Sequence, residues 1–204
     1  MGQVFMNSIA IFCGSSLGVD PAFEVAARQT GTYLAQQGKT LVYGGGRSGL
    51  MGIVADSALA AGGRVIGVIP QGLVDRELAH PGLSELHVVT SMHERKTLMA
   101  ELSDGFVALP GGAGTIEEIF EQWTWAQLGI HLKPCGFLNI NGFYDLLLQF
   151  IQHTTTQQFT RERFTNQLIQ SASIEEIVQQ FEQYQPPQPK WGVQDQADLV
   201  KIDS

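Results

Sequence analysis

The chain has 204 residues, 44% of them hydrophobic and 16% charged, with a formal net charge of −8 at pH 7. This length allows one sizeable core, so we expect a single domain, and the acidic balance argues against a general nucleic-acid binder, which would need a basic stripe. No apolar run approaches the roughly 20 residues of a membrane-spanning helix, and residues 1–16 lack the basic region of a signal peptide, so we expect a cytoplasmic protein without a membrane partner.

Short β-branched segments alternate with helical patterns, as in a parallel sheet flanked by helices. The predicted strands are 8–13, 40–43, 64–69, 86–89, 105–109 and 135–140, with a further candidate at 167–169. The predicted helices are 21–37, 50–61, 92–102, 115–128, 144–153 and 173–184. This order predicts an α/β fold, a Rossmann-like doubly wound parallel sheet with helices on both faces, in one domain over residues 1–184. Residues 185–204 are polar and contain prolines, and we expect a flexible tail.

Three of the predicted strand-to-helix turns are rich in glycine, namely 14–18, 44–49 and 111–115. In a parallel sheet such turns converge beyond the carboxyl ends of the strands, where glycine lets several backbone amides approach one anion. The second turn matches G-x-G-x-x-G, but the next strand ends in Val68-Ile-Pro-Gln71, without the acid that binds the ribose in a dinucleotide site. An NAD site is therefore not expected, and tight packing alone remains an alternative for this turn.

The third turn, Pro110-Gly-Gly-Ala-Gly-Thr-Ile-Glu-Glu118, combines three glycines with a hydroxyl group and two carboxylates. Thr115 and Glu118 also fit a capping box, in which a glutamate in the first helical turn satisfies the N-cap amide. That alternative requires no catalysis, but it leaves the glycines unexplained.

A cluster of charges, Met92-His-Glu-Arg-Lys96, begins the fourth predicted helix. Arg95 and Lys96 lie near the helix N-terminus, where cations oppose the macrodipole, so their placement indicates an anionic ligand. A surface ion pair is the alternative. Glu77, in the polar loop after the third strand, could reach the same site, although a solvated loop acid would look the same.

Signatures of metal sites and nucleophiles are weak. The histidines at 80, 87, 93, 131 and 153 lack ligand spacing, and no G-x-S-x-G motif is present. A pyridoxal enzyme needs a Schiff-base lysine, and only Lys96 lies near a plausible phosphate site. Cys13 and Cys135 occur in apolar stretches and are expected to be small core residues rather than disulfide or zinc ligands.

The segments 92–96 and 110–118, followed by Trp123-Thr-Trp-Ala-Gln-Leu-Gly129, closely resemble the LOG (Lonely Guy) family of cytokinin riboside 5′-monophosphate phosphoribohydrolases. The resemblance extends from about residue 9 to residue 181 and includes Tyr43-Gly-Gly-Gly46 and Leu50-Met-Gly52. It implies hydrolysis of adenosine 5′-monophosphate, or of its N6-substituted forms, to free base and ribose 5-phosphate. It also implies a homodimer or larger homo-oligomer.

The resemblance assigns roles to matching positions. Arg95 and Glu118 correspond to the catalytic pair, while the family usually has tyrosine where this chain has Ala113. The expected substrate-binding residues are Glu77, Lys96, Gly112, Ala113, Gly114, Thr115, Ile116, Glu117 and Thr124, together with Ser15, Gly45, Gly46, Met92 and Gly111 from the turns and the charged helix. No metal or cofactor is expected.

Breaking an N-glycosidic bond develops positive charge on the sugar, which a carboxylate such as Glu118 can stabilise while it aligns water. Arg95 could hold the substrate or offset charge on the leaving group, and the sequence does not distinguish these roles. The first alternative to an enzyme is a non-catalytic nucleotide sensor or carrier, and a pyridoxal-dependent decarboxylase is a further one.

Overall fold

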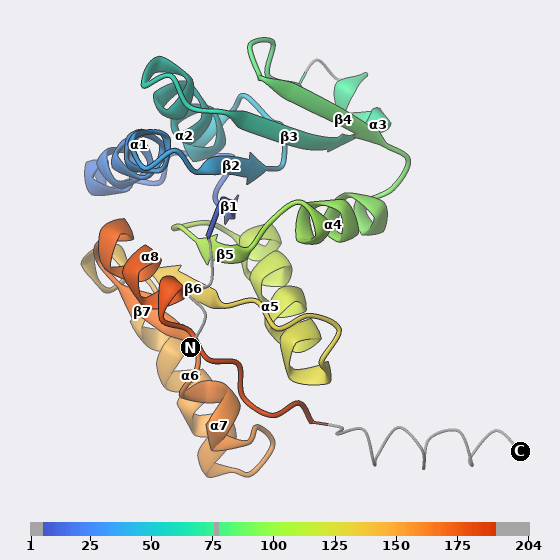
Figure 1. Cartoon of the computed structure of the whole chain (residues 1–204). Helices are drawn as coiled ribbons and strands as arrows, with labels where there is room; N and C mark the ends of the chain where they lie inside the picture. Colours follow the sequence, from blue (N-terminus) through green and yellow to red (C-terminus); the bar gives the residue numbers. More distant parts are fainter. Residues whose placement is uncertain (1–5, 76–77, 191–204) are drawn as a thin grey trace, which may run out of the picture.

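A computed structural model describes residues 6–75 and 78–190 of the chain. Its centre is one sheet of seven parallel strands in the order β4-β3-β2-β1-β5-β6-β7 (Figure 1). The strands are β1 (Ser8–Phe12), β2 (Thr40–Tyr43), β3 (Val65–Pro70), β4 (Glu85–Val89), β5 (Gly105–Ala108), β6 (Cys135–Leu138) and β7 (Ile169–Ser171). The predicted α/β, doubly wound parallel sheet is confirmed.

Helices connect the strands and cover both faces of the sheet. They are α1 (Pro21–Gln36), α2 (Gly49–Ala60), α3 (Gln71–Val74), α4 (Met92–Glu101), α5 (Ala113–Leu128), α6 (Asp145–Thr156), α7 (Glu162–Thr165) and α8 (Ile174–Glu182), with a 3-10 turn η1 (Ile140–Gly142). The short elements α3, α7 and η1 were not predicted, because three or four residues are too few to show a helical period.

Alternate residues of the central strand supply two separate cores. On β1, Ile9 and Ile11 pack with α1, α2 and α8, whereas Ala10 and Phe12 pack with α4, α5 and α6. Figure 1 shows α1, α2 and α8 on the opposite side of the sheet from α4 and α5. A strand that is buried on both faces has a continuous run of apolar residues, which explains why the strands could be predicted from the sequence.

The last strand was predicted slightly too early, at 167–169. Leu168 belongs instead to the turn that follows α7, where its amide donates to the Thr165 carbonyl at 3.1 Å, and its side chain packs on the core beside α4, α5 and α6. The strand therefore begins at Ile169.

Residues 185–190, where the predicted tail begins, run alongside α5 and α7. The Lys190 amide donates to the Gln127 carbonyl at 2.7 Å, and the Arg163 guanidinium donates to the Pro189 carbonyl at 3.1 Å. Residues 191–204 lie outside the described part of the chain. None of the helices in the described ranges combines the length and apolar character that crossing a membrane requires.

Candidate active site

The strand order reverses between β1 and β5, because β2 to β4 extend from β1 on one side and β6 and β7 extend from β5 on the other. In doubly wound sheets the ligand lies outside the carboxyl ends of the strands at such a switch point. A cavity of about 630 Å³ lies there, and the turns after β1, β2 and β5 all contribute to its lining. Ligand cavities in proteins are commonly of this size.

The turn after β5 leads directly into α5, whose N-terminus opens into the cavity. The helix begins at Ala113, its N-cap is Gly112, and no side chain caps it. The first backbone N–H groups of a helix have no partner within the helix, so this end offers several donors and a positive dipole to an anion. An added Cβ on Gly112 or Gly114 would meet nothing within 4 Å, so the space before the helix is open.

This helix start shows that the capping-box interpretation of Thr115 and Glu118 is wrong. Both residues lie inside α5, two and five positions after its first residue, and both are buried. The helix begins earlier than predicted because Gly112, rather than Thr115, takes the extended N-cap conformation. Thr115 instead packs against Gly111, where an added Cβ would lie 2.1 Å from the Thr115 hydroxyl oxygen.

The turns after β1 and β5 support one another. The Gly14 amide donates to the Pro110 carbonyl at 3.1 Å, and the Leu109 amide donates to the Phe12 carbonyl at 2.9 Å. On the far side of β5 the buried Tyr144 hydroxyl donates to the Leu109 carbonyl at 2.6 Å, and burial raises the pKa of Tyr144, so this donor keeps its proton. The start of α5 is therefore held from two directions.

The charged helix α4 is capped by its own residues. The Ser91 hydroxyl accepts from the Glu94 amide at 3.1 Å, and the Glu94 carboxylate accepts from the Thr90 amide at 2.7 Å. Glu94 thus offsets the unfavourable position of the two cations that follow it. The side chains of Arg95 and Lys96 turn inward and are buried. The surface ion pair considered from the sequence is excluded for Arg95, whose partner is also buried, but Lys96 pairs with Glu117, whose side chain is 55% exposed.

Arg95 lines the cavity and forms an ion pair with Glu118 of α5. Arg95 is 8% exposed and Glu118 is 6% exposed. The guanidinium also lies against the turn after β2, where an added Cβ on Gly44 would be 3.3 Å from the Arg95 Cζ atom. Burial lowers the pKa of Arg95, partly offset by the charge of Glu117, but arginine remains protonated. Its Nε atom is buried without a hydrogen-bond partner.

Lys96 joins α4 to α5. Its ammonium group forms ion pairs with Glu117 and, at 3.0 Å, with Glu121. Burial alone would lower the pKa of Lys96, but its hydrogen bonds to the two glutamates outweigh burial and raise it. Lys96 is not among the residues that line the cavity.

Apolar side chains that the sequence analysis did not identify form the opposite wall of the cavity. They are Met51, Ile69, Leu73 and Leu78, which join Met92 there. The backbone of residues 78–80 holds this wall against the turn after β2, because the Arg47 amide donates to the Leu78 carbonyl and the His80 amide donates to the Gly45 carbonyl. The only sequence signal was the position of Leu73 and Leu78 on either side of a polar loop.

The structure brings most, but not all, of the expected site residues to one cavity. Those that line it are Ser15, Gly46, Met92, Arg95, Gly112, Ala113, Gly114, Thr115, Glu117 and Glu118. Gly45, Lys96, Ile116 and Thr124 lie outside the lining, and Gly111 lines a neighbouring cleft. Glu77 lies outside the described residues. Thr124 is exposed on α5, six residues or about 9 Å beyond Glu118 along the helix.

The residues present do not fit a pyridoxal site. None of the described residues that line the cavity is a lysine, and the ammonium group of Lys96 is engaged by two glutamates. Within the described ranges, no three histidine, cysteine, aspartate or glutamate side chains gather as they would around a metal ion. Cys13 and Cys135 are both free and buried, as expected for small core residues.

Comparison with known proteins relates the chain to enzymes that act on nucleotides. A family model described as possible lysine decarboxylase matches residues 51–181. The cytokinin riboside 5′-monophosphate phosphoribohydrolase LOG of Oryza sativa subsp. japonica is 45% identical over 178 residues, which cover 87% of this chain and 74% of the relative. The cytokinin riboside 5′-monophosphate phosphoribohydrolase of Rhodococcoides fascians is 47% identical over 173 residues, or 84% of this chain and 87% of the relative.

Solved structures share the same architecture. The molybdenum cofactor binding protein from Rippkaea orientalis has a TM-score of 0.67 at 20% identity, covering 88% of this chain and 98% of that chain. The molybdenum cofactor carrier protein from Chlamydomonas reinhardtii has a TM-score of 0.66 at 20% identity, covering 88% of this chain and 100% of that chain. At this identity the likeness extends to the fold alone.

Proposed function

The chain belongs to the LOG family of cytokinin riboside 5′-monophosphate phosphoribohydrolases, and from this membership we propose that it is an N-glycosidase acting on adenosine 5′-monophosphate or its N6-substituted forms. It releases the free base and ribose 5-phosphate. One observation carries the proposal: the buried pair of Arg95 and Glu118 lies in the same cavity as the uncapped start of α5. The alternative, a sensor or carrier, has no use for a carboxylate beside the sugar.

The start of α5 binds the 5′-phosphate. Backbone amides from Gly112 to Thr115 donate to its oxygens, and the helix dipole adds a favourable field. Ala113 leaves these amides more accessible than a tyrosine would. The apolar wall that includes Leu73, Leu78 and Met92 receives the base. Binding energy from the two ends of the substrate orients the bond between them.

Glu118 acts at the anomeric carbon. An ion pair with a guanidinium favours the carboxylate form of an acid, which stabilises positive charge as the bond to the base nitrogen weakens and accepts a proton from the attacking water. The water oxygen bonds to the anomeric carbon, the bond to the base breaks, and the proton ends on the base nitrogen. The free Nε donor of Arg95 holds the sugar or the departing base.

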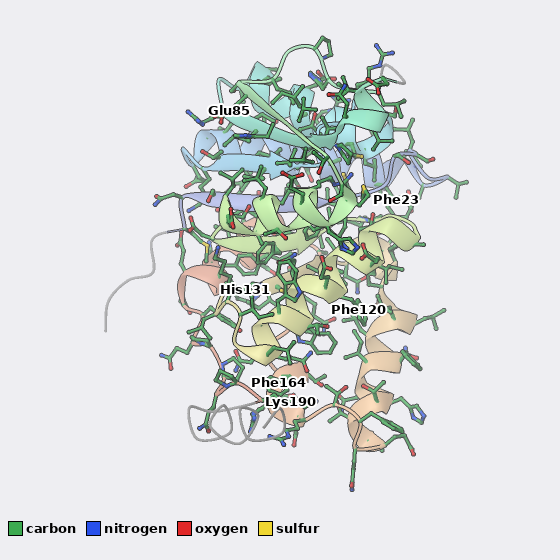
Figure 2. The ribbon with its side chains drawn as sticks, turned by 90° about the vertical axis from the view of Figure 1, so that its right-hand side faces the viewer. Phe23, Glu85, Phe120, His131, Phe164 and Lys190 are labelled. Carbon is green, nitrogen blue, oxygen red and sulfur yellow. The ribbon has the colours of Figure 1, made fainter. Side chains whose placement is uncertain are left out.

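The protein acts as a homodimer, and Thr124 contributes to the cavity of the partner copy. Support comes from its position: Thr124 is exposed and too far along α5 to reach the cavity of its own chain. In Figure 2, α4 and α5 run across the side that faces the viewer, with Phe120 of α5 and His131 after it labelled. That side is available to a second copy. Two free buried cysteines are compatible with the reducing cytoplasm, where we place the protein.

The decisive experiment incubates the protein with a panel of nucleoside 5′-monophosphates and measures free base by chromatography. The Glu118→Gln variant keeps the shape of the side chain and removes its charge, and we expect base release to fall by at least about 100-fold while nucleotide binding persists. Adenosine, which lacks the phosphate, serves as the matched control substrate. Full turnover by the variant, or equal rates with adenosine, would refute the assigned roles.

A further inference from the structure

A second cleft adjoins the cavity on the other side of the switch point. Its volume is about 300 Å³, and it shares Gly14, Ser15 and Gly112 with the main cavity. The main cavity extends under the turn after β2 and the end of β3, whereas the second cleft extends toward Phe143, which follows β6. The two spaces therefore meet at the amides that open α5.

The walls of the second cleft are apolar and partly exposed. Leu17 and Phe143 are 46% and 41% exposed, and Phe23 and Leu50 lie beside them in the lining. No charged side chain among the described residues lines the cleft. Exposed apolar side chains that converge next to a polar anchor indicate an apolar ligand group.

Specific contacts fix the shape of this cleft. The Phe143 ring meets the edge of the Phe23 ring, with centroids 5.4 Å apart. The Asn141 amide donates to the Asp20 carboxylate at 2.9 Å and so ties the turn before Phe143 to the start of α1. Gly18 has a φ of 77° and packs against Phe23, which folds the turn after β1 over the cleft. The cleft is thus built before any ligand binds.

We propose that this cleft binds an apolar or aromatic group esterified to the 5′-phosphate of a nucleotide, so that the protein also accepts 5′-phosphodiesters. The inference rests on the proposed function, which puts the phosphate at the shared residue Gly112. A phosphate held there presents one oxygen to each space, and doubly wound sheets bind two-part ligands across the switch point in this way. The absence of cations in the described lining favours an uncharged group over a second phosphate.

The test measures the dissociation constants of three ligands by calorimetry: adenosine 5′-monophosphate, its methyl ester and its phenyl ester. It uses the Glu118→Gln protein as the background, so that no ligand is hydrolysed during the titration. Both esters carry one negative charge fewer than the monophosphate, so the comparison between them isolates the contribution of the phenyl ring to the affinity. An edge-to-face contact with Phe143 makes the phenyl ester bind about fivefold more tightly than the methyl ester. Phe143→Ala removes this ratio, whereas Leu146→Ala, which lies on α6 outside the cleft and is 81% exposed, preserves it.

Equal affinities of the two esters, failure of both esters to bind, or a ratio that survives Phe143→Ala would overturn the inference. Binding does not depend on turnover, so a protein that binds the monophosphate without releasing base would refute the proposed hydrolase while the ester comparison still decides the cleft. If none of the three ligands binds, both proposals fail together.

Discussion

Replacing Arg95 by methionine tests whether a desolvated ion pair holds Glu118 in place. The side chains of Arg95 and Glu118 are 10% and 8% exposed, so the pair lies in the protein interior. Removing the arginine leaves the carboxylate buried without its guanidinium partner. We therefore expect Arg95→Met to lose both stability and activity.

The expected loss of stability follows from burial. Breaking one side of a buried ion pair costs about 3–5 kcal/mol, because the remaining charge is uncompensated. Removing both partners relieves that cost, so Arg95→Met combined with Glu118→Met should recover most of the stability. It should not recover activity, since the variant lacks the carboxylate.

Urea denaturation measures these differences directly. With a slope of about 2 kcal/mol per molar urea, the single variant should unfold roughly 2 M earlier than the wild type. Arg64→Met is the matched control: Arg64 pairs with Glu85 at 2.6 Å, but the two side chains are 60% and 38% exposed. A solvated pair of this kind contributes about 0.5 kcal/mol.

Two results would refute this reasoning. A change below about 1 kcal/mol for Arg95→Met would mean that the pair is solvated in the folded protein. Normal base release by the same variant would remove Arg95 from the site, whatever its effect on stability.

Gly111→Ala should destabilise the fold by at least about 2 kcal/mol, because the new Cβ would lie 2.1 Å from Thr115 Oγ1. Gly114→Ala, which has open space around it, should not destabilise the fold, and thermal unfolding of both variants measures the difference. Burial, with a contribution from Lys133, lowers the pKa of His131 to about 4, so the unfolded chain takes up the proton more readily and stability falls as pH drops from 6.5 toward 4. The ring is partly exposed, so we expect the free energy of unfolding, measured by urea titration, to fall by about 2 kcal/mol between pH 6.5 and pH 4. His131→Gln should not show this fall. Thr124→Trp and Glu118→Gln chains should each be inactive as homodimers but regain about a quarter of the wild-type activity when co-expressed, and no recovery would refute a shared site.

The fold was predictable because each strand and most helices carry a local signal. The N-cap Asp20 followed by Pro21 marked the start of α1, and the Asp20 carboxylate indeed accepts from the Ala22 amide at 2.9 Å. The central strands were apolar without alternation, which is typical of strands buried on both faces. The convergence of the glycine-rich turns was expected because parallel strands end on one edge, whereas the order of the strands in the sheet was not predicted.

The site was less predictable because its residues come from separate segments. The pattern could place Arg95 and Glu118 near each other, but nothing local distinguished the cavity-facing Arg95 from the neighbouring Lys96, which binds two glutamates instead. Tyr144 gave no functional signal, since its contact with the Leu109 carbonyl joins positions 35 residues apart. Long-range contacts of this kind depend on the packing of whole elements.

The three consecutive charged residues of α4 point in different directions because of the helix geometry, so each makes different contacts. Successive residues turn by about 100° around the axis, so Glu94, Arg95 and Lys96 face different surroundings. Glu94 accepts from the backbone before the helix, Arg95 lines the cavity, and Lys96 pairs with Glu117 and Glu121 of α5. The cations oppose the helix dipole, yet each forms an ion pair with an acid of α5: Arg95 with Glu118, and Lys96 with Glu117 and Glu121. Exchanging the two cations would therefore place a lysine beside Glu118 and lose the planar guanidinium, whose Nε atom has no hydrogen-bond partner.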